Sequence, residues 1–160
     1  MVINKALFSS NKQGWGTPPE LFMALNSEFN FKMDAATTED NPLGTEYYYT
    51  KDMDGLAQEN RWISPIYINP PYGRDIKKWV ARASMEMVMN RAVSVMLLPA
   101  RTDTKWFHTY LYDLKEDHYR EGIRVKFLKG RLRMFDYETD SYSKNTAPFP
   151  SMIVVFKLQC

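Results

Sequence analysis

Hydrophobic residues recur along the chain in two patterns, and each pattern predicts a different kind of element. Recurrence at helical spacing predicts an amphipathic helix, whereas alternation or a short unbroken apolar run predicts a strand. The helical spacing occupies residues 17–29, 75–90 and 104–114. Strand patterns lie within residues 29–37, 45–56, 65–70, 92–100, 122–135 and 151–158, where 122–135 is expected to hold a strand and its hairpin partner.

The order of these elements predicts an α/β protein. A strand, the helix at 75–90 and a further strand imply a right-handed parallel crossover. We expect a mostly parallel sheet with helices on both faces, closed by an antiparallel C-terminal strand at 151–158. Asp34 and Asn69 come at the ends of two of the parallel strands. Because ligands bind outside the carboxyl ends of such strands, both side chains are predicted to lie at one edge of the sheet.

Length and composition narrow the architecture. With 160 residues, 44% of them hydrophobic, the chain suits a single domain over residues 1–160 without a separate target-recognition domain. One cysteine, Cys160, and two histidines, His108 and His118, argue against a disulfide framework and a metal site. The start of the chain lacks the apolar core of a secretion signal, and no later run is long enough to span a membrane. We therefore expect a soluble cytoplasmic protein without a membrane partner.

The sequence Asn69-Pro70-Pro71-Tyr72 follows a short apolar strand and is suited to hold a planar amine. Consecutive prolines fix the backbone and remove two N–H donors, so the local carbonyl groups are rigid and free to accept. The side-chain oxygen of Asn69 and the main-chain oxygen of Pro70 are predicted to accept hydrogens from one amino group, while Tyr72 offers a face for stacking. This arrangement suits an adenine or cytosine base taken out of its helix. For the motif alone, a rigid turn that merely ends the strand remains an alternative.

Positive charge is concentrated in part of the chain, although the net charge is only +2. Between Arg120 and Arg133, six basic residues stand against one acid, Glu121, which favours contact with nucleic-acid phosphates over a solvated hairpin face. The predicted DNA-binding residues are Arg74, Arg101, Lys105, Lys126, Lys129, Arg131 and Arg133, the last two also as candidates for a guanine edge. The loop at 136–150 offers three candidates to line a target base, Tyr142, Asn145 and Phe149. For these three residues, packing within the loop is the favoured alternative.

Five blocks of sequence resemble, in their order, the small phage-type DNA N-6-adenine methyltransferases of the Dam family. The blocks are "WGTPP" (15–19), "DAA" (34–36), "NPPYG" (69–73), "LLPARTDT" (97–104) and "GRLRMF" (130–135), and the resemblance covers roughly residues 14–157. It implies an abridged class I (Rossmann-like) methyltransferase fold in a bacteriophage or prophage protein that acts in a bacterial cytoplasm. The implied reaction is methylation of the N6 amine of adenine in DNA, with S-adenosylmethionine as cofactor, base flipping and no metal. We expect a monomer or a weak homodimer.

The resemblance also implies the cofactor contacts. Thr17, an N-cap candidate for the first helix, is similar to a residue that holds the methionine end, and a helix N-terminus suits a carboxylate. Asp34 corresponds to the acid that meets the methionine ammonium, and Asp54 resembles the acid that binds the adenine amine. The full predicted set is Thr17, Pro18, Asp34, Ala35, Ala36 and Asp54, with a purely structural role as the alternative for Pro18 and Asp54. Ribose-binding candidates are Glu39, Asp40 and Glu46.

The chain departs from the family pattern in two places. No glycine-rich loop follows Asp34, the next glycine being Gly44, and only 35 residues separate Asp34 from Asn69. Three other functions remain open: an N4-cytosine DNA methyltransferase, a glutamine methyltransferase that acts on proteins, and a catalytically inactive DNA-binding methyltransferase fold. Asn69 and the basic residues favour adenine in a nucleic acid, and an intact Asn69 and Tyr72 argue against an inactive fold.

Overall fold

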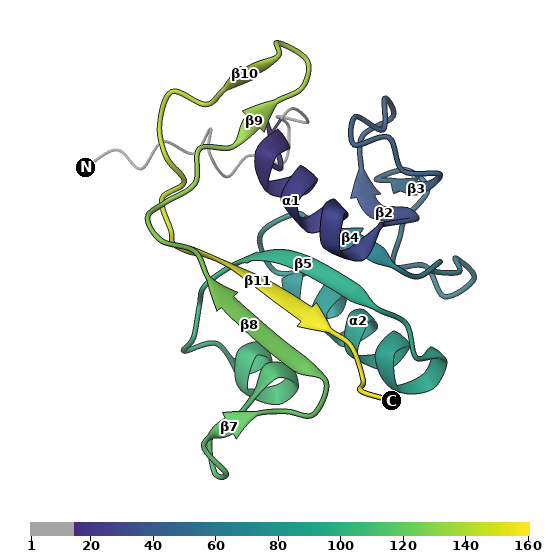
Figure 1. The fold of residues 1–160 in the computed structure, drawn as a ribbon, viewed down its shortest axis with the longest axis vertical. Helices are drawn as coiled ribbons and strands as arrows, with labels where there is room; N and C mark the ends of the chain where they lie inside the picture. Colours follow the sequence, from purple (N-terminus) through teal and green to yellow (C-terminus); the bar gives the residue numbers. More distant parts are fainter. Residues whose placement is uncertain (1–14) are drawn as a thin grey trace.

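The computed structural model describes residues 15–160, and its centre is a six-stranded mixed sheet (Figure 1). In spatial order the strands are β3 (Tyr47–Thr50), β2 (Met33–Thr37), β4 (Ile66–Ile68), β5 (Ser94–Pro99), β11 (Ser151–Phe156) and β8 (Ile123–Phe127). The first four pair in parallel, whereas β11 runs antiparallel to both of its neighbours. The predicted α/β class and the antiparallel last strand are confirmed.

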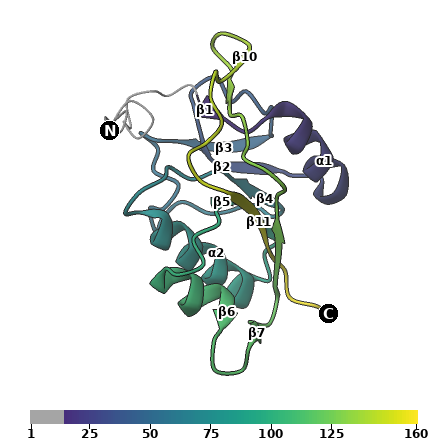
Figure 2. The ribbon, with the colours of Figure 1, turned by 90° about the vertical axis from the view of Figure 1, so that its left-hand side faces the viewer.

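Side chains of the central strands alternate between two apolar cores, one on each face of the sheet. On one face Ile66 and Ile68 belong to the core that contains the buried side of α2 (Ile76–Asn90). On the other face Tyr67, between them in sequence, lies in the core beneath α1 (Pro19–Phe29). Figure 2 shows the sheet between these two helices. The central strands are buried on both sides, which explains their nearly unbroken apolar sequence.

The predicted helices at 17–29 and 75–90 are confirmed, with one change at the start of the first. α1 begins at Pro19, and its N-cap residue Pro18 makes no side-chain cap bond. The expectation that Thr17 caps this helix is wrong, because its side chain bonds to the sheet instead. α2 buries the residues that its spacing predicts, namely Ile76, Trp79, Val80, Ala83 and Met87.

The helix predicted at 104–114 is shorter than expected. It contains the π-helical turn η2 (Phe107–Leu111) and then changes to the short strand β6 (Tyr112–Asp113), which pairs with β7 (His118–Tyr119). The helix stops because the Asp113 carboxylate accepts the backbone N–H groups of Lys115 (3.0 Å) and Glu116 (3.1 Å), which forms a turn instead. Within residues 15–160, no helix is both long and apolar enough to cross a membrane.

The predicted hairpin at 122–135 is wrong in its second half. β8 is a strand, but it pairs with β11, whose other edge is taken by β5. The chain then leaves the large sheet and reaches β9 (Phe135–Asp136), which lies between β1 (Trp15–Gly16) and β10 (Ser141–Tyr142) in a separate small sheet. Since β11 is buried along its whole length, it needs a partner on both edges, and β8 supplies the second.

Candidate active site

The segments that follow the parallel strands emerge at one edge of the sheet, and the predicted site residues lie along it. Asp34 of β2 faces Tyr67 of β4 in the register, two residues before Asn69. The predicted proximity of Asp34 and Asn69 is therefore confirmed. Asp34 does not end its strand, however: pairing with β4 stops there, while β2 continues to Thr37 along β3 across an irregularity in register.

A chain of hydrogen bonds fixes the side-chain amide of Asn69. Its nitrogen donates to the Thr17 hydroxyl at 3.3 Å, and its oxygen accepts from the Tyr72 hydroxyl at 3.3 Å. The Thr17 hydroxyl is also 2.5 Å from the Tyr67 hydroxyl, and the Thr17 carbonyl accepts from the Tyr137 hydroxyl at 2.7 Å. Thr17 is only 2% exposed, so it lies as a buried link between the start of α1 and the end of β4.

The rest of the Asn-Pro-Pro-Tyr segment forms one side of an aromatic site. Pro70 is buried, Pro71 is exposed and Tyr72 is half-buried. The Tyr72 and Phe149 rings are perpendicular, with a centroid distance of 5.2 Å, and the Arg101 guanidinium lies 5.9 Å from the centre of the Phe149 ring. Burial raises the pKa of Tyr72, so its hydroxyl stays protonated and can keep donating to Asn69.

Asp34 is a buried acid, with 3% of its surface exposed. Burial raises its pKa from 3.8 to about 7, although hydrogen bonds from the Ala36 backbone and the Thr37 side chain oppose this shift. A carboxyl group with such a pKa ionises readily when a cation approaches. Asp34 is therefore suited to pair with a positively charged ligand group near neutral pH.

Asp54 lies in the segment that follows β3, beside the end of β2. It is exposed, has a positive φ of 57°, and accepts the Leu56 backbone N–H at 3.1 Å, as expected for a turn residue. The next residue, Gly55, lies so close to the Ala35 carbonyl that a Cβ atom would be 2.3 Å from its oxygen. Only glycine permits this approach, so the turn is held directly against Ala35, which is itself fully buried.

A pocket of about 340 Å³ lies next to the same turn. Its lining residues are Glu39, Tyr48, Thr50, Asp52 and Met53. All three ribose candidates are exposed, and of these only Glu39 lines this pocket. Glu39 and Asp52 thus line the same pocket, and two carboxylates at one pocket suit a pair of hydroxyl groups.

The predicted DNA-binding residues are all exposed, and most leave the sheet at the edge that carries Asn69. Arg74 follows β4, while Arg101 and Lys105 follow β5. β8 runs in the same direction as β5, so Lys129, Arg131 and Arg133 also emerge there, after Lys126 within the strand. Arg120, the first basic residue of the 120–133 cluster, is not free for DNA in the same way. Its guanidinium donates hydrogen bonds to the His108 carbonyl (2.8 Å) and to the Asp113 carboxylate (3.3 Å).

The structure separates the three loop residues that are candidates to line a base. Phe149 contacts the Tyr72 ring, so it lies beside the Asn-Pro-Pro-Tyr segment, and its role in lining a base stays a prediction. Tyr142 instead bonds Glu20 of α1 at 2.5 Å, and Asn145 is exposed. Sequence reasoning missed Tyr67 and Tyr137. The signal for Tyr67 was available, since a tyrosine inside a buried strand needs a hydrogen-bond partner for its hydroxyl.

Both histidines bond to main-chain carbonyl groups near them in sequence. His108 contacts Thr102 at 2.7 Å and His118 contacts Tyr119 at 2.9 Å. In the part of the chain that the structure describes, no group of three or more His, Cys, Asp or Glu side chains is arranged to hold a metal ion.

Comparison with known proteins identifies similar sequences in phages. The family model described as DNA N-6-adenine-methyltransferase (Dam) matches residues 5–159. A DNA N-6-adenine-methyltransferase of Haemophilus phage HP1 (strain HP1c1) is 29% identical over 150 residues, which cover 92% of this chain and 80% of the relative. Another, of Escherichia phage T1, is 35% identical over 98 residues, which cover 58% of this chain and 38% of the relative. No solved structure matches the chain significantly.

The family match spans nearly the whole sequence and includes all five blocks from which the resemblance was inferred. The predicted family and enzyme class are thereby confirmed. The chain belongs to the DNA N-6-adenine-methyltransferase (Dam) family.

Proposed function

We propose that this protein methylates the N6 amine of adenine in DNA, with S-adenosylmethionine as the methyl donor and the target base flipped into a pocket formed by residues 69–72. The observation that carries the proposal is the fixed amide of Asn69. Its orientation is set by Thr17 on one side and Tyr72 on the other, next to the Tyr72–Phe149 aromatic pair.

On the base side, the proposed work of the protein is positioning and hydrogen bonding. An amide oxygen has two acceptor sites, so Asn69 can accept one N6 hydrogen while it still accepts from Tyr72. The carbonyl of Pro70 accepts the second hydrogen, and Pro71 keeps that carbonyl rigid. The nitrogen lone pair is thereby directed out of the base plane, and its surplus proton passes to solvent or to the acceptors. Tyr72 stacks on the base, with the Phe149 ring packed perpendicular to the Tyr72 ring.

On the cofactor side, the donor set fits S-adenosylmethionine. When bound, this cofactor supplies a methyl group carried on a positively charged sulfur. The buried Asp34 carboxyl suits its ammonium group, and Glu39 and Asp52 at the 340 Å³ pocket suit its ribose hydroxyls. Asp54 is proposed to accept from the adenine amine. Ala35 and Ala36 permit close approach along β2, while Thr17 and Pro18 at the start of α1 border the methionine end.

The proposed DNA surface surrounds this edge. Arg74, Arg101, Lys129, Arg131 and Arg133 are exposed there and suit phosphate contacts, as do Lys105 and Lys126 near it. The fold that we propose is an abridged class I methyltransferase sheet in which one domain carries both catalysis and DNA contact. We propose that it works as a monomer or weak homodimer.

Nucleoside mass spectrometry tests this function. Unmethylated DNA is incubated with the protein and S-adenosylmethionine, then digested to nucleosides. The proposal predicts N6-methyladenine, and its absence in a sample that binds both cofactor and DNA contradicts the proposal. Detection of N4-methylcytosine instead would show that the target is the exocyclic amine of cytosine. DNA binding without any methylated product supports an inactive DNA-binding fold.

A further inference from the structure

The connection between β3 and β4, residues 51–65, has neither a helix nor a strand to satisfy its backbone groups. It crosses the face of the sheet that α2 covers, and a groove of about 1120 Å³ runs beside it. The lining of this groove includes Gln58, Glu59, Arg61, Arg82 and Met85. Apolar packing anchors part of the connection, since Trp62 is buried and its ring stacks on that of Trp79 at a centroid distance of 6.2 Å. The polar backbone groups of the connection still need partners, which hydrogen bonds supply.

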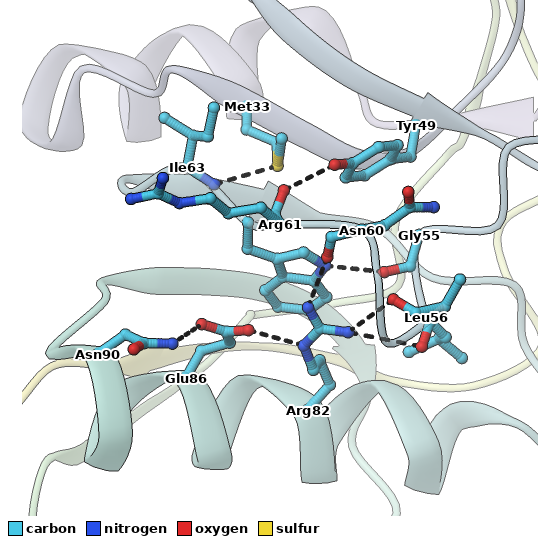
Figure 3. Close-up of polar contacts among 12 residues, drawn as sticks. Met33, Tyr49, Gly55, Leu56, Asn60, Arg61, Ile63, Arg82, Glu86 and Asn90 are labelled. Atoms are coloured by element: carbon cyan, nitrogen blue, oxygen red, sulfur yellow. Dashed lines mark hydrogen bonds and ion pairs between the residues drawn. The ribbon is translucent and has the colours of Figure 1, made fainter.

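Arg82 of α2 supplies many of these bonds (Figure 3). Its guanidinium donates to the carbonyl groups of Asn60 at 2.7 Å and Ala57 at 3.3 Å, with a longer contact to Leu56 at 3.5 Å. The same group lies 5.0 Å from the centre of the Trp62 ring. One side chain of a regular helix thus holds several points of an irregular segment.

Glu86 keeps Arg82 in place. Its carboxylate accepts the Arg82 Nε–H at 2.8 Å and the Asn90 side-chain amide at 2.7 Å. The two charged side chains are only 11% and 6% exposed. A buried guanidinium with a fixed counter-ion has its remaining N–H groups directed at defined positions, here the carbonyl groups of the connection.

Two residues of the connection extend the network to Asp54. The Asn60 amide donates to the carbonyl groups of Met53 and Asp54, both at 2.7 Å, and the Trp62 indole donates to Gly55 at 2.8 Å. Gly55 in turn packs against the Ala35 carbonyl. The path from Arg82 through Asn60 and Trp62 therefore fixes the turn that borders β2 and the 340 Å³ pocket.

We propose that Arg82, held by Glu86, is a positioning residue for cofactor binding: it clamps the β3–β4 connection so that the Asp54–Gly55 turn stays against Ala35. This inference rests on the proposed function, since it assigns the turn to the cofactor side. It also separates Arg82 from the DNA-binding cations, because its guanidinium is used inside the protein.

The test compares Arg82→Met and Asn60→Ala with Arg120→Met. Arg120 is a matched control, since it also bonds a carbonyl group and a carboxylate, but near η2 and β6. Calorimetric titration with S-adenosylmethionine, hydrogen exchange over residues 51–65 and steady-state kinetics are measured on variants whose thermal unfolding shows that they are folded. R82M is expected to weaken cofactor affinity and raise the cofactor KM roughly tenfold, a common size for coupling between sites. N60A is expected to have a smaller effect in the same direction.

The control fixes the interpretation. R82M should speed hydrogen exchange in residues 51–65 while leaving kcat at saturating cofactor and the KM for DNA near those of the unmodified protein. Unchanged affinity in a folded R82M protein overturns the positioning role, as does an equal loss of affinity in R120M. If R82M does not fold, N60A decides by the same criteria. A wild-type protein that binds no S-adenosylmethionine overturns the proposed function itself, and the clamp with it.

Discussion

The base side and the cofactor side of the proposed site lie at one sheet edge but are held in different ways. Asn69 directly follows β4 and is fixed by hydroxyl groups from neighbouring elements, with Thr17 and Tyr67 both buried. The Asp54 turn belongs to a connection without regular structure, whose carbonyl groups accept hydrogen bonds from a guanidinium of α2. Substitutions on the two sides should therefore have different effects. Those on the base side should lower kcat, and those on the cofactor side should weaken the affinity for the cofactor.

The largest expected effect is from Asn69→Ala. Removing the amide deletes one acceptor for the N6 amine and the partner of Tyr72. Loss of a group that orients and stabilises the reacting atoms costs on the order of 100- to 1000-fold in kcat. Radiolabelled methyl transfer measures the rate, and calorimetry should show nearly unchanged cofactor affinity. If kcat survives, the assignment of Asn69 to the base side fails.

On the cofactor side, affinity for S-adenosylmethionine should depend on pH through Asp34. Its pKa is raised to about 7, so the acid is neutral below that pH and must ionise to pair with an ammonium group. Affinity should fall by up to about tenfold per pH unit below about 7 and level off above it. Titrations from about pH 5.5 to about pH 8.5 measure this, and Asp34→Asn should flatten the profile.

The raised pKa of Asp34 also determines how the stability of the folded protein changes with pH. The folded state binds the proton of the Asp34 carboxyl group more tightly than the unfolded chain does. The stability contributed by this proton is therefore present below about pH 4 and lost as the pH rises to about 7. Asp34→Asn should therefore gain in relative thermal stability above neutral pH.

For the affinity prediction, a wild-type protein whose affinity for S-adenosylmethionine does not change across the titrated pH range would remove Asp34 from the cofactor contacts.

A smaller effect is expected from Tyr67→Phe, which keeps the buried ring but removes the hydroxyl next to Thr17. Loss of one neutral hydrogen bond is worth about 1 kcal/mol, so kcat should fall about fivefold as the Thr17–Asn69 contact loosens. Cofactor affinity should stay constant. Tyr112→Phe is the matched control, because its hydroxyl bonds Asp117 in a distant turn. Equal losses in both variants would show that Tyr67 does not act through Asn69.

The smallest effects belong to the exposed cations, which lie outside both sides of the comparison. Lys129→Ala and Arg131→Ala should each raise the KM for DNA about threefold and reduce its salt dependence by about one counter-ion. Neither kcat nor cofactor affinity should change. Lys157→Ala, also exposed but beyond β11, serves as the control. Fluorescence anisotropy of labelled DNA at several salt concentrations measures the effect, and an unchanged slope would exclude the residue from the DNA surface.

Elements with a strong local pattern could be predicted from the sequence. The spacing of Trp79, Val80 and Ala83 identified α2 because that face is buried along its length. The hairpin at 122–135 failed because strand pairing is decided by distant partners, here β11. Periodicity describes one segment at a time and contains no information on which edge a strand will occupy.

The same distinction holds for the site. Asn69 and Tyr72 are visible in the sequence because their motif follows a strand, and Asp34 because it is an acid within an apolar strand pattern. The bond from Asn69 to Thr17 joins residues far apart in sequence, and no local rule predicts it. Arg82 was invisible for another reason, since an arginine on an amphipathic helix ordinarily belongs to the solvated face. Its burial depends on an irregular segment that sequence patterns describe only as a loop.

The position of β11 has a consequence for how the protein is made. This strand lies inside the large sheet between β5 and β8, yet its residues are translated after both of them. Until they leave the ribosome, β5 exposes an apolar edge and β8 has no partner in the sheet. Synthesis of most of the chain therefore yields an aggregation-prone intermediate, and active enzyme should accumulate only after residues 151–156 have emerged.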